Sequence, residues 1–401
     1  MNYFLIGGEF NNKGAEAMTF VAVWNIFKYD KDAIIYIYEK DSYNPYDFGE
    51  KVHMLDCPLQ LLNRLSGRKI SIKTWIKEFI KIFIPWKKSS IGKKRKVEKV
   101  LKTINVMIDI SGYHLSSKWG KILSNEYCDW INLLKKNGAK VFLMPQSFGP
   151  FDYNSGEMVK FIADTLSKCD IIFAREKDGY NLLLNLGLNN VTYCYDSVLL
   201  ENEMDRKKII LNYDKYFEEL KVDSDNNIAI VPNYRLLDKT NINKEKLIDF
   251  YCKIISDNSN NNFYLISHAK EDIEICKIIK NKFQNNDRVI FIDHVLCSFN
   301  YENFVNKMNF IIASRYHSIV HAYKENVPSI IIGWAKKYDE LASTFNQNDY
   351  LIALEALDES YNKINQMFTN YREESVKIRS ILEVVQKNNC YSFLRDLNEN
   401  K

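Results

Sequence analysis

The chain has 401 residues, which is too long for one ordinary hydrophobic core, so we expect two domains. Its 46% hydrophobic and 26% charged residues are typical of a soluble globular protein and exclude an intrinsically disordered one. No apolar run reaches the 18 residues of a membrane-spanning helix. The formal charge of +4 hides an asymmetry, because thirteen Lys/Arg against two Glu give residues 68–102 a charge of +11 and leave the rest at −7.

Short apolar runs alternate with helical patterns from the N-terminus onward. Runs of this length between helices are typical of a parallel sheet that is covered on both faces. The first strands are expected at 3–6, 33–38, 106–110, 141–144, 171–174 and 191–194, with a helix over 14–27. After a charged stretch the pattern restarts, with strands expected at 228–231, 263–266, 289–292, 310–313 and 330–332.

These patterns predict an α/β protein with two doubly wound, Rossmann-like domains and a cleft between them. We expect the first domain over 1–200, a linker over 201–227, the second domain over 228–358 and a helical tail over 359–401. The eight cysteines show no CxxC spacing and most lie in apolar segments, which favours reduced, buried thiols and a cytoplasmic location.

The basic segment 68–102 combines a lysine stripe with aromatic residues at helical spacing. Lys69, Lys73, Lys77 and Lys81 recur every four residues, and apolar side chains that include Trp75 and Phe79 lie between them. A basic amphipathic helix of this kind favours docking on an anionic membrane surface. An ordinary helix packed on the first domain remains the alternative, and no recognition motif supports nucleic-acid binding.

The end of the 310–313 strand carries the strongest chemical signal. The apolar run stops at Ser314, and Arg315, Tyr316, His317 and Ser318 open a helix. Lys337 follows the next apolar run. Strand ends that lead into helix N-termini bind anions in open α/β sheets, so these residues predict a site for a small, multiply charged anion. His321 lies one turn after His317, but no HExxH motif or carboxylate accompanies the pair, so no metal is expected.

Further candidates follow strands of the first domain. Arg175 ends the 171–174 strand, where it could bind a carboxylate or phosphate or pair locally with Glu176 or Asp178. Asp196 ends the next strand and could cap a helix or contact a ligand. Loops that could present groups to a ligand, or serve only as turns, contain Asn12, Glu16, Gly112, His114, Gln146 and Ser147.

Taken in order, these motifs resemble the polysaccharide pyruvyl transferase family. The matching elements are residues 12–16, Gly112, 145–151, 174–176, Leu186-Gly187, Asp196, 315–318, Val327-Pro328 and Trp334 with Lys337. The resemblance implies a fold similar to the two-domain glycosyltransferase B architecture. The sequence departs from the family pattern at Trp334, where a tyrosine is usual, and at Glu16 after Ala15, where many members have Gly-Asp.

The resemblance also implies an activity. The enolpyruvyl group of phosphoenolpyruvate would move onto two hydroxyls of a sugar, forming a cyclic ketal and releasing phosphate, without cofactor or metal. By motif, Arg175, Arg315 and His317 would be catalytic, and Tyr316, Ser318 and Lys337 would join them in binding phosphoenolpyruvate. The acceptor, a lipid-linked oligosaccharide, would contact Asn12, Glu16, Gly112, His114, Gln146 and Ser147.

Location and two competing functions complete the expectations. The enzyme would work in the cytoplasm, peripherally on the inner face of a bacterial membrane. A nucleotide-sugar-dependent glycosyltransferase of the same fold is the first alternative, although no convincing set of base- and ribose-binding residues is evident. A non-catalytic glycan-binding relative is the second.

Overall fold

The computed structural model describes residues 1–38, 43–57, 59–67, 88–222 and 225–399. Within these ranges the first domain has a seven-stranded parallel sheet in the order β3-β2-β1-β4-β5-β6-β7. Its strands are β1 (Asn2–Ile6), β2 (Ile34–Tyr38), β3 (Val52–Leu55), β4 (Val106–Asp109), β5 (Lys140–Gln146), β6 (Ile171–Ala174) and β7 (Val191–Tyr193). Its helices are α1 (Lys13–Tyr29), α2 (Leu59–Ser66), α4 (Lys88–Leu101), α5 (Gly120–Lys136), α6 (Gly156–Leu166), α7 (Lys177–Asn185) and α8 (Ser197–Leu200).

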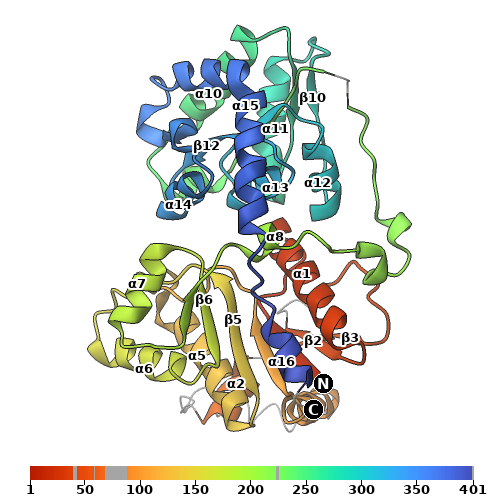
Figure 1. Ribbon diagram of the computed structural model, residues 1–401, viewed down its shortest axis with the longest axis vertical. Helices are drawn as coiled ribbons and strands as arrows, with labels where there is room; N and C mark the ends of the chain where they lie inside the picture. Colours follow the sequence, from red (N-terminus) through yellow and green to blue (C-terminus); the bar gives the residue numbers. More distant parts are fainter. Residues whose placement is uncertain (39–42, 58, 68–87, 223–224, 400–401) are drawn as a thin grey trace.

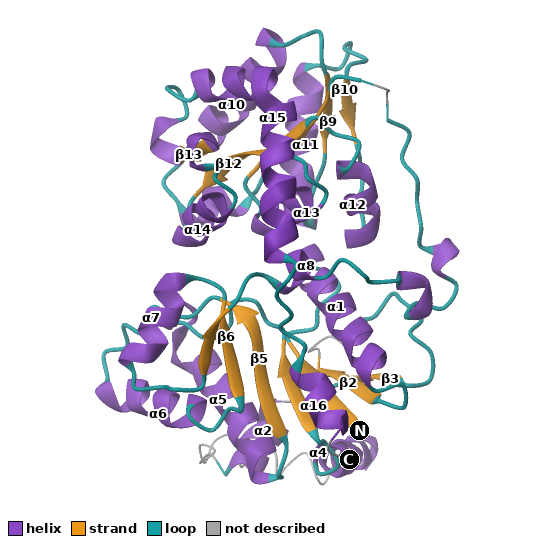
Figure 2. Cartoon of the chain, in the orientation of Figure 1, coloured by secondary structure: helices purple, strands orange, loops and turns teal. Residues whose placement is uncertain are grey.

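The second domain repeats this architecture (Figures 1 and 2). Its described strands form a six-stranded parallel sheet in the order β10-β9-β8-β11-β12-β13. They are β8 (Asn227–Val231), β9 (Asn262–Leu265), β10 (Val289–Phe291), β11 (Phe310–Ala313), β12 (Ser329–Gly333) and β13 (Leu351–Ala353). Its helices are α9 (Arg235–Lys239), α10 (Lys244–Asp257), α11 (Ile273–Lys282), α12 (Ser298–Val305), α13 (Tyr316–Lys324), α14 (Lys336–Thr344) and α15 (Tyr361–Val385), and α16 (Phe393–Glu399) follows them in the chain.

Both sheets are doubly wound, which confirms the predicted fold class. Their order reverses between β1 and β4 in the first domain and between β8 and β11 in the second, and loops at such switch points hold ligands. The central strands are buried on both faces, as their unbroken apolar runs predict. The edge strands β3 and β13 were missed because they are short and only partly buried.

The two domains share one side of their hydrophobic cores. Phe20 of α1 packs against Phe299 of α12 with ring centroids 5.9 Å apart, and Glu16 of α1 accepts a hydrogen bond from the backbone amide of Ser298 at 2.6 Å. The segment expected to be a linker connects α8 to β8 along the side of the molecule (Figure 1). It is more than a tether, because its Ile209 and Ile210 are buried in this shared core.

The C-terminal segment returns to the first domain. Helix α15 packs on the second domain, and the chain then crosses so that α16 lies against α1 and β5 of the first (Figure 1). Phe393 of α16 stacks on Phe142 of β5, with ring centroids 3.8 Å apart and an interplanar angle of 13°. The predicted helical tail is therefore a strap across both domains.

The basic helix predicted over 68–102 is described only in part. Residues 68–87, which include Trp75, Phe79 and the lysine stripe, lie outside the described ranges, and α4 covers the rest. Among the helices that are described, none has the length and apolar character needed to cross a membrane.

We expect Phe393→Ala to lower the free energy of unfolding by about 3–5 kcal/mol, because it empties a buried aromatic site between the strap and β5. Val384→Ala is the matched control, since Val384 of α15 is 60% exposed. Urea denaturation of both variants provides the measurement. Equal midpoints would show that α16 contributes nothing to the stability of the first domain.

Candidate active site

The carboxyl ends of the two sheets face a common cleft with a volume of about 1470 Å³. Loops after β1, β4, β5 and β6 line it from the first domain, and loops after β8, β9, β11 and β12 line it from the second. Small-molecule sites usually have volumes of about 300–1,000 Å³, so this cleft can hold more than one small substrate.

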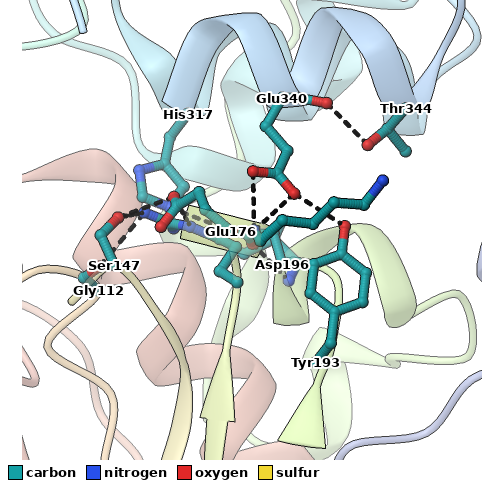
Figure 3. Close-up of polar contacts among 11 residues, drawn as sticks. Gly112, Ser147, Glu176, Tyr193, Asp196, His317, Glu340 and Thr344 are labelled. Carbon is teal, nitrogen blue, oxygen red and sulfur yellow. Dashed lines mark hydrogen bonds and ion pairs between the residues drawn. The ribbon is translucent and has the colours of Figure 1, made fainter. Parts of the chain in front are cut away.

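Arg175 is buried at the first-domain wall and is held by four polar groups, which belong to Gly112, Ser147, Glu176 and Asp196, all labelled in Figure 3. Its Nε donates to Glu176 Oε1 at 3.1 Å and its Nη1 to Asp196 Oδ2 at 2.7 Å. Its Nη2 donates to the Gly112 carbonyl at 3.2 Å and to Ser147 Oγ at 2.9 Å. These bonds use four of the five guanidinium N–H donors, so one Nη1 hydrogen remains for a ligand.

Asp196 joins Arg175 to His317 across the domain boundary. Its Oδ2 lies 3.6 Å from His317 Nε2, and its Oδ1 caps α8 by accepting from the Val198 amide at 2.9 Å. Although burial opposes ionisation, the nearby His317 imidazole and the charge of Arg175 hold the pKa of Asp196 well below its usual range. Burial lowers the pKa of His317, against the opposing effect of Asp196. At neutral pH the pair is therefore a carboxylate beside a neutral imidazole.

His317 rests directly on the N-terminus of α1. A Cβ on Gly14 would lie 2.1 Å from His317 Nδ1 and 2.4 Å from its Cγ, so only glycine fits there. Asn12 fixes the same turn, because its side chain accepts from the Gly14 amide at 3.1 Å. The imidazole of the second domain is thus positioned by two residues of the first.

Lys337 lies among aromatic rings in the cleft. Its Nζ is 5.0 Å from the centroid of Tyr316, 5.6 Å from Tyr338 and 5.8 Å from Trp334. In the described part of the chain it forms no ion pair with a carboxylate. Burial, together with the positive charge of Arg175, lowers the pKa of Lys337 to about 8. This cation is available to an anionic ligand.

Arg315 and two helix N-termini also line the cleft on the second-domain side, where Asp272 and Glu271 balance the charge of Arg315. Arg315 Nε donates to Asp272 Oδ2 at 3.0 Å, and its Nη2 donates to Asp272 Oδ1 and Glu271 Oε1 at 2.6 and 2.9 Å. Its Nη1 has no hydrogen-bond partner among the described residues. Helices α13 and α14 both begin at the cleft without a side-chain cap, and exposed amides at such ends attract anions.

Glu340, on the same helix as Lys337, attaches this helix to the first domain (Figure 3). Both of its carboxylate oxygens accept from the Lys177 amide, at 2.7 and 2.8 Å, and Tyr193 donates to Oε1 at 3.3 Å. Helix α7 has no side-chain cap of its own, so Glu340 caps it from the other domain. This contact fixes the position of Lys337 relative to Arg175, which lies two residues before the first residue of α7.

The profile of one protein family, described as polysaccharide pyruvyl transferase, matches residues 12–336. The chain belongs to the polysaccharide pyruvyl transferase family. It is accordingly a transferase of polysaccharide biosynthesis. None of the curated proteins matches the chain significantly.

Solved structures show what fold this chain shares. It resembles S. aureus TarM, in a structure with UDP, with a TM-score of 0.57 and 12% identity over 100% of this chain and 99% of TarM. It also resembles S. aureus MnaA with UDP (TM-score 0.53, 12% identity, 93% and 90% of the two chains). The chain also resembles the UDP-GlcNAc 2-epimerase of Methanocaldococcus jannaschii, with a TM-score of 0.52 and 13% identity over 100% of this chain and 99% of the epimerase. These likenesses show a glycosyltransferase B-like fold.

Most of the site residues predicted from the sequence line the cleft. They are Asn12, Gly112, His114, Ser147, Arg175, Arg315, Tyr316, His317 and Lys337. Arg175 differs from expectation in that its charge is already balanced by Glu176 and Asp196, the local pairing that the sequence left open.

Three predicted residues do not line the cleft. Glu16 is fully buried at the domain contact, where it pairs with Lys13 at 2.5 Å and binds the Ser298 amide. Gln146 is buried and donates to Asp109 Oδ2 at 2.5 Å. Ser318 is buried and donates to the Arg315 carbonyl at 2.6 Å. The geometry gives all three bracing contacts and does not support direct ligand contacts.

Other lining residues were not predicted. Asn233 and Arg235 follow β8, and a consistent search of strand ends would have found both. His268 follows β9, is 4% exposed, and its pKa is lowered well below the usual value by burial and by His321. Glu340, which caps α7 and does not line this cleft, had no sequence pattern that predicted its role, because its partners lie more than 140 positions away in the sequence. No group of three metal-ligating side chains is found in the described ranges.

We expect Gly14→Ala to reduce turnover by about tenfold or more, because the new methyl group must displace the His317 ring. Helix propensity alone predicts that the substitution raises the free energy of unfolding, since alanine is favoured over glycine in a helix by about 1 kcal/mol. Steady-state kinetics and thermal unfolding together test this. Full turnover in a stabilised variant would show that His317 does not need its place against α1.

Proposed function

We propose that this transferase moves the enolpyruvyl group of phosphoenolpyruvate onto two hydroxyls of a sugar in a lipid-linked surface-polysaccharide precursor. The observation that carries the proposal is Lys337, a cation without a carboxylate partner among the described residues, beside Arg315 and the uncapped ends of α13 and α14. Phosphoenolpyruvate presents a carboxylate and a phosphate, and this arrangement offers a separate donor group to each.

The reaction balances without a cofactor. The methylene carbon gains a proton and becomes a methyl group, C2 forms bonds to two sugar oxygens, and the C2–O bond to phosphate breaks. The two hydroxyls release two protons. One of them balances the proton that the methylene carbon gains, and the other is carried away by the released phosphate. The site must therefore bind a dianionic leaving group and accept a proton from a hydroxyl.

His317 is the proposed proton acceptor. The ionised Asp196 beside Nε2 favours the tautomer with a proton on that nitrogen, which leaves the lone pair on Nδ1. Because its pKa is lowered, the imidazole is neutral near pH 7 and can accept a hydroxyl proton. Arg175 positions this pair by holding Asp196, and its remaining Nη1 hydrogen can also reach the donor.

We expect Lys337→Met to lower kcat/KM for phosphoenolpyruvate by about 100-fold, because a donor charge would lose its partner. In the wild type, KM should rise as the pH passes about 8, since Lys337 loses its charge there, and the variant should lack this rise. Phosphate release with a panel of nitrophenyl hexosides measures both quantities.

Lys336→Met is the matched control for this experiment. The neighbouring Lys336 side chain is 87% exposed and pairs with Asp178 at 2.7 Å, so this variant should keep the pH-dependent rise in KM. The same rise of KM with pH in Lys337→Met would contradict a role for Lys337 in binding phosphoenolpyruvate. Absence of phosphate release with every acceptor would contradict the proposed donor.

A nucleotide-sugar-dependent glycosyltransferase remains the second candidate, favoured only by the fold shared with TarM and MnaA. Likeness at this level of identity concerns architecture, and function depends on the site. The two activities differ in product, since one adds a pyruvate ketal and the other a sugar. Mass spectrometry of the acceptor separates them, and a non-catalytic glycan binder would leave the acceptor unchanged.

We also propose that residues 68–102 dock on an anionic membrane surface, where a lipid-linked acceptor would be found; α4, the described part of this segment, lies at the end of the first domain away from the second domain (Figure 2). The test is sedimentation with anionic and neutral vesicles. We expect salt-sensitive binding to the anionic vesicles only, weakened by reversing Lys69 and Lys73 to Glu. Reversing Lys207 and Lys208, which are 67% and 70% exposed, is the control with equal charge change. Equal sedimentation with both vesicle types would contradict the proposal.

A further inference from the structure

The first-domain end of the cleft has an aromatic wall that the donor chemistry does not use. Trp119, at the start of α5, lines the cleft and is 36% exposed. Its ring packs edge-on against Tyr113, with centroids 5.3 Å apart. An exposed tryptophan at a cavity costs solvation free energy, which a ligand that covers it would recover.

This wall is rigid and adjacent to the donor site. The Tyr113 hydroxyl donates to the Gly149 carbonyl at 2.7 Å, which fixes the ring under Trp119. Gly112, the residue before Tyr113, accepts from Arg175 at 3.2 Å. The aromatic pair therefore lies one residue along the chain from the wall of the donor site, in the same continuous cleft.

Polar groups lie beside the aromatic pair. Lys118 precedes Trp119 and also lines the cleft, as does Asp152. The loop that carries Asp152 packs on the same turn, since the Asp152 amide donates to Ser117 Oγ at 3.3 Å and the Ser117 amide donates to the Pro150 carbonyl at 2.9 Å. An aromatic pair in a cleft wall that also contains a lysine and an aspartate suits a pyranose, which has C–H groups on its faces and hydroxyls on its rim.

We propose that Trp119 and Tyr113 form a subsite for a sugar residue of the acceptor next to the one that receives the ketal, so that the enzyme prefers oligosaccharides. This inference rests on the proposed function and adds to it the residues that would recognise a neighbouring sugar of the acceptor. The cleft volume of about 1470 Å³ leaves room beyond the donor and one sugar. The pyranose face stacks on the indole, while Lys118 and Asp152 bind its hydroxyls.

The test compares oligosaccharides of two to four hexose units with the corresponding nitrophenyl monosaccharides, using the full chain. Phosphate release from phosphoenolpyruvate gives kcat/KM for each acceptor, and calorimetric titration gives oligosaccharide affinity without turnover. In the wild type we expect kcat/KM to be higher for oligosaccharides. In Trp119→Ala the ratio of kcat/KM for oligosaccharide over monosaccharide should fall about tenfold, and Trp119→Phe should restore most of it.

Ile122→Ala is the matched control, because Ile122 is 75% exposed on the same helix and does not line the cleft. It should keep the wild-type ratio. An unchanged ratio in Trp119→Ala, or an equal fall in Ile122→Ala, would overturn the subsite. Phosphate release without oligosaccharide preference would overturn the subsite alone. Tryptophan-dependent oligosaccharide binding without phosphate release would support the subsite and contradict the proposed donor.

Discussion

The buried carboxylate of Asp196 is the point on which both sides of the cleft converge. It caps α8, accepts from Arg175 of the first domain and faces His317 of the second. A buried carboxylate needs such partners, because an unpaired charge in the interior is costly. Its charge, together with that of Glu176, balances the charge of Arg175. The His317 imidazole is placed by contacts from both domains, with Asp196 and Gly14 on one side and its own helix α13 on the other.

The rest of the site also depends on contacts between the two domains. Gly14 gives His317 room against α1, and Glu340 caps α7 while its own helix carries Lys337. One side of the cleft thus consists of charges that are already paired, around Arg175. The other carries Lys337 and the uncapped ends of α13 and α14, while Arg315 beside them is paired with Asp272 and Glu271 and keeps only its Nη1 without a partner among the described residues.

The sequence predicted the fold well, because apolar runs such as 228–231 and 310–313 mark strands buried on both faces. The position of Arg315, His317 and Lys337 just after predicted strands indicated that they share one site, and all three line the cleft. The sequence could not predict which polar residues face the cleft. Glu16 and Gln146 do not line it, because they bind the distant Ser298 amide and Asp109 side chain. Ser318 does not line it either, because its hydroxyl turns back to the Arg315 carbonyl at the start of its own helix. The return of α16 to β5, and the capping of α7 by Glu340, are long-range contacts with no local pattern.

The most direct test of the central claim is to run the reaction in D₂O with phosphoenolpyruvate and an oligosaccharide acceptor and to analyse the product by mass spectrometry and NMR. Protonation of the methylene carbon by solvent-derived hydrogen predicts one deuterium in the ketal methyl group and one phosphate released per ketal. A product that keeps a vinyl group, or an acceptor that gains a sugar in place of pyruvate, would contradict the account.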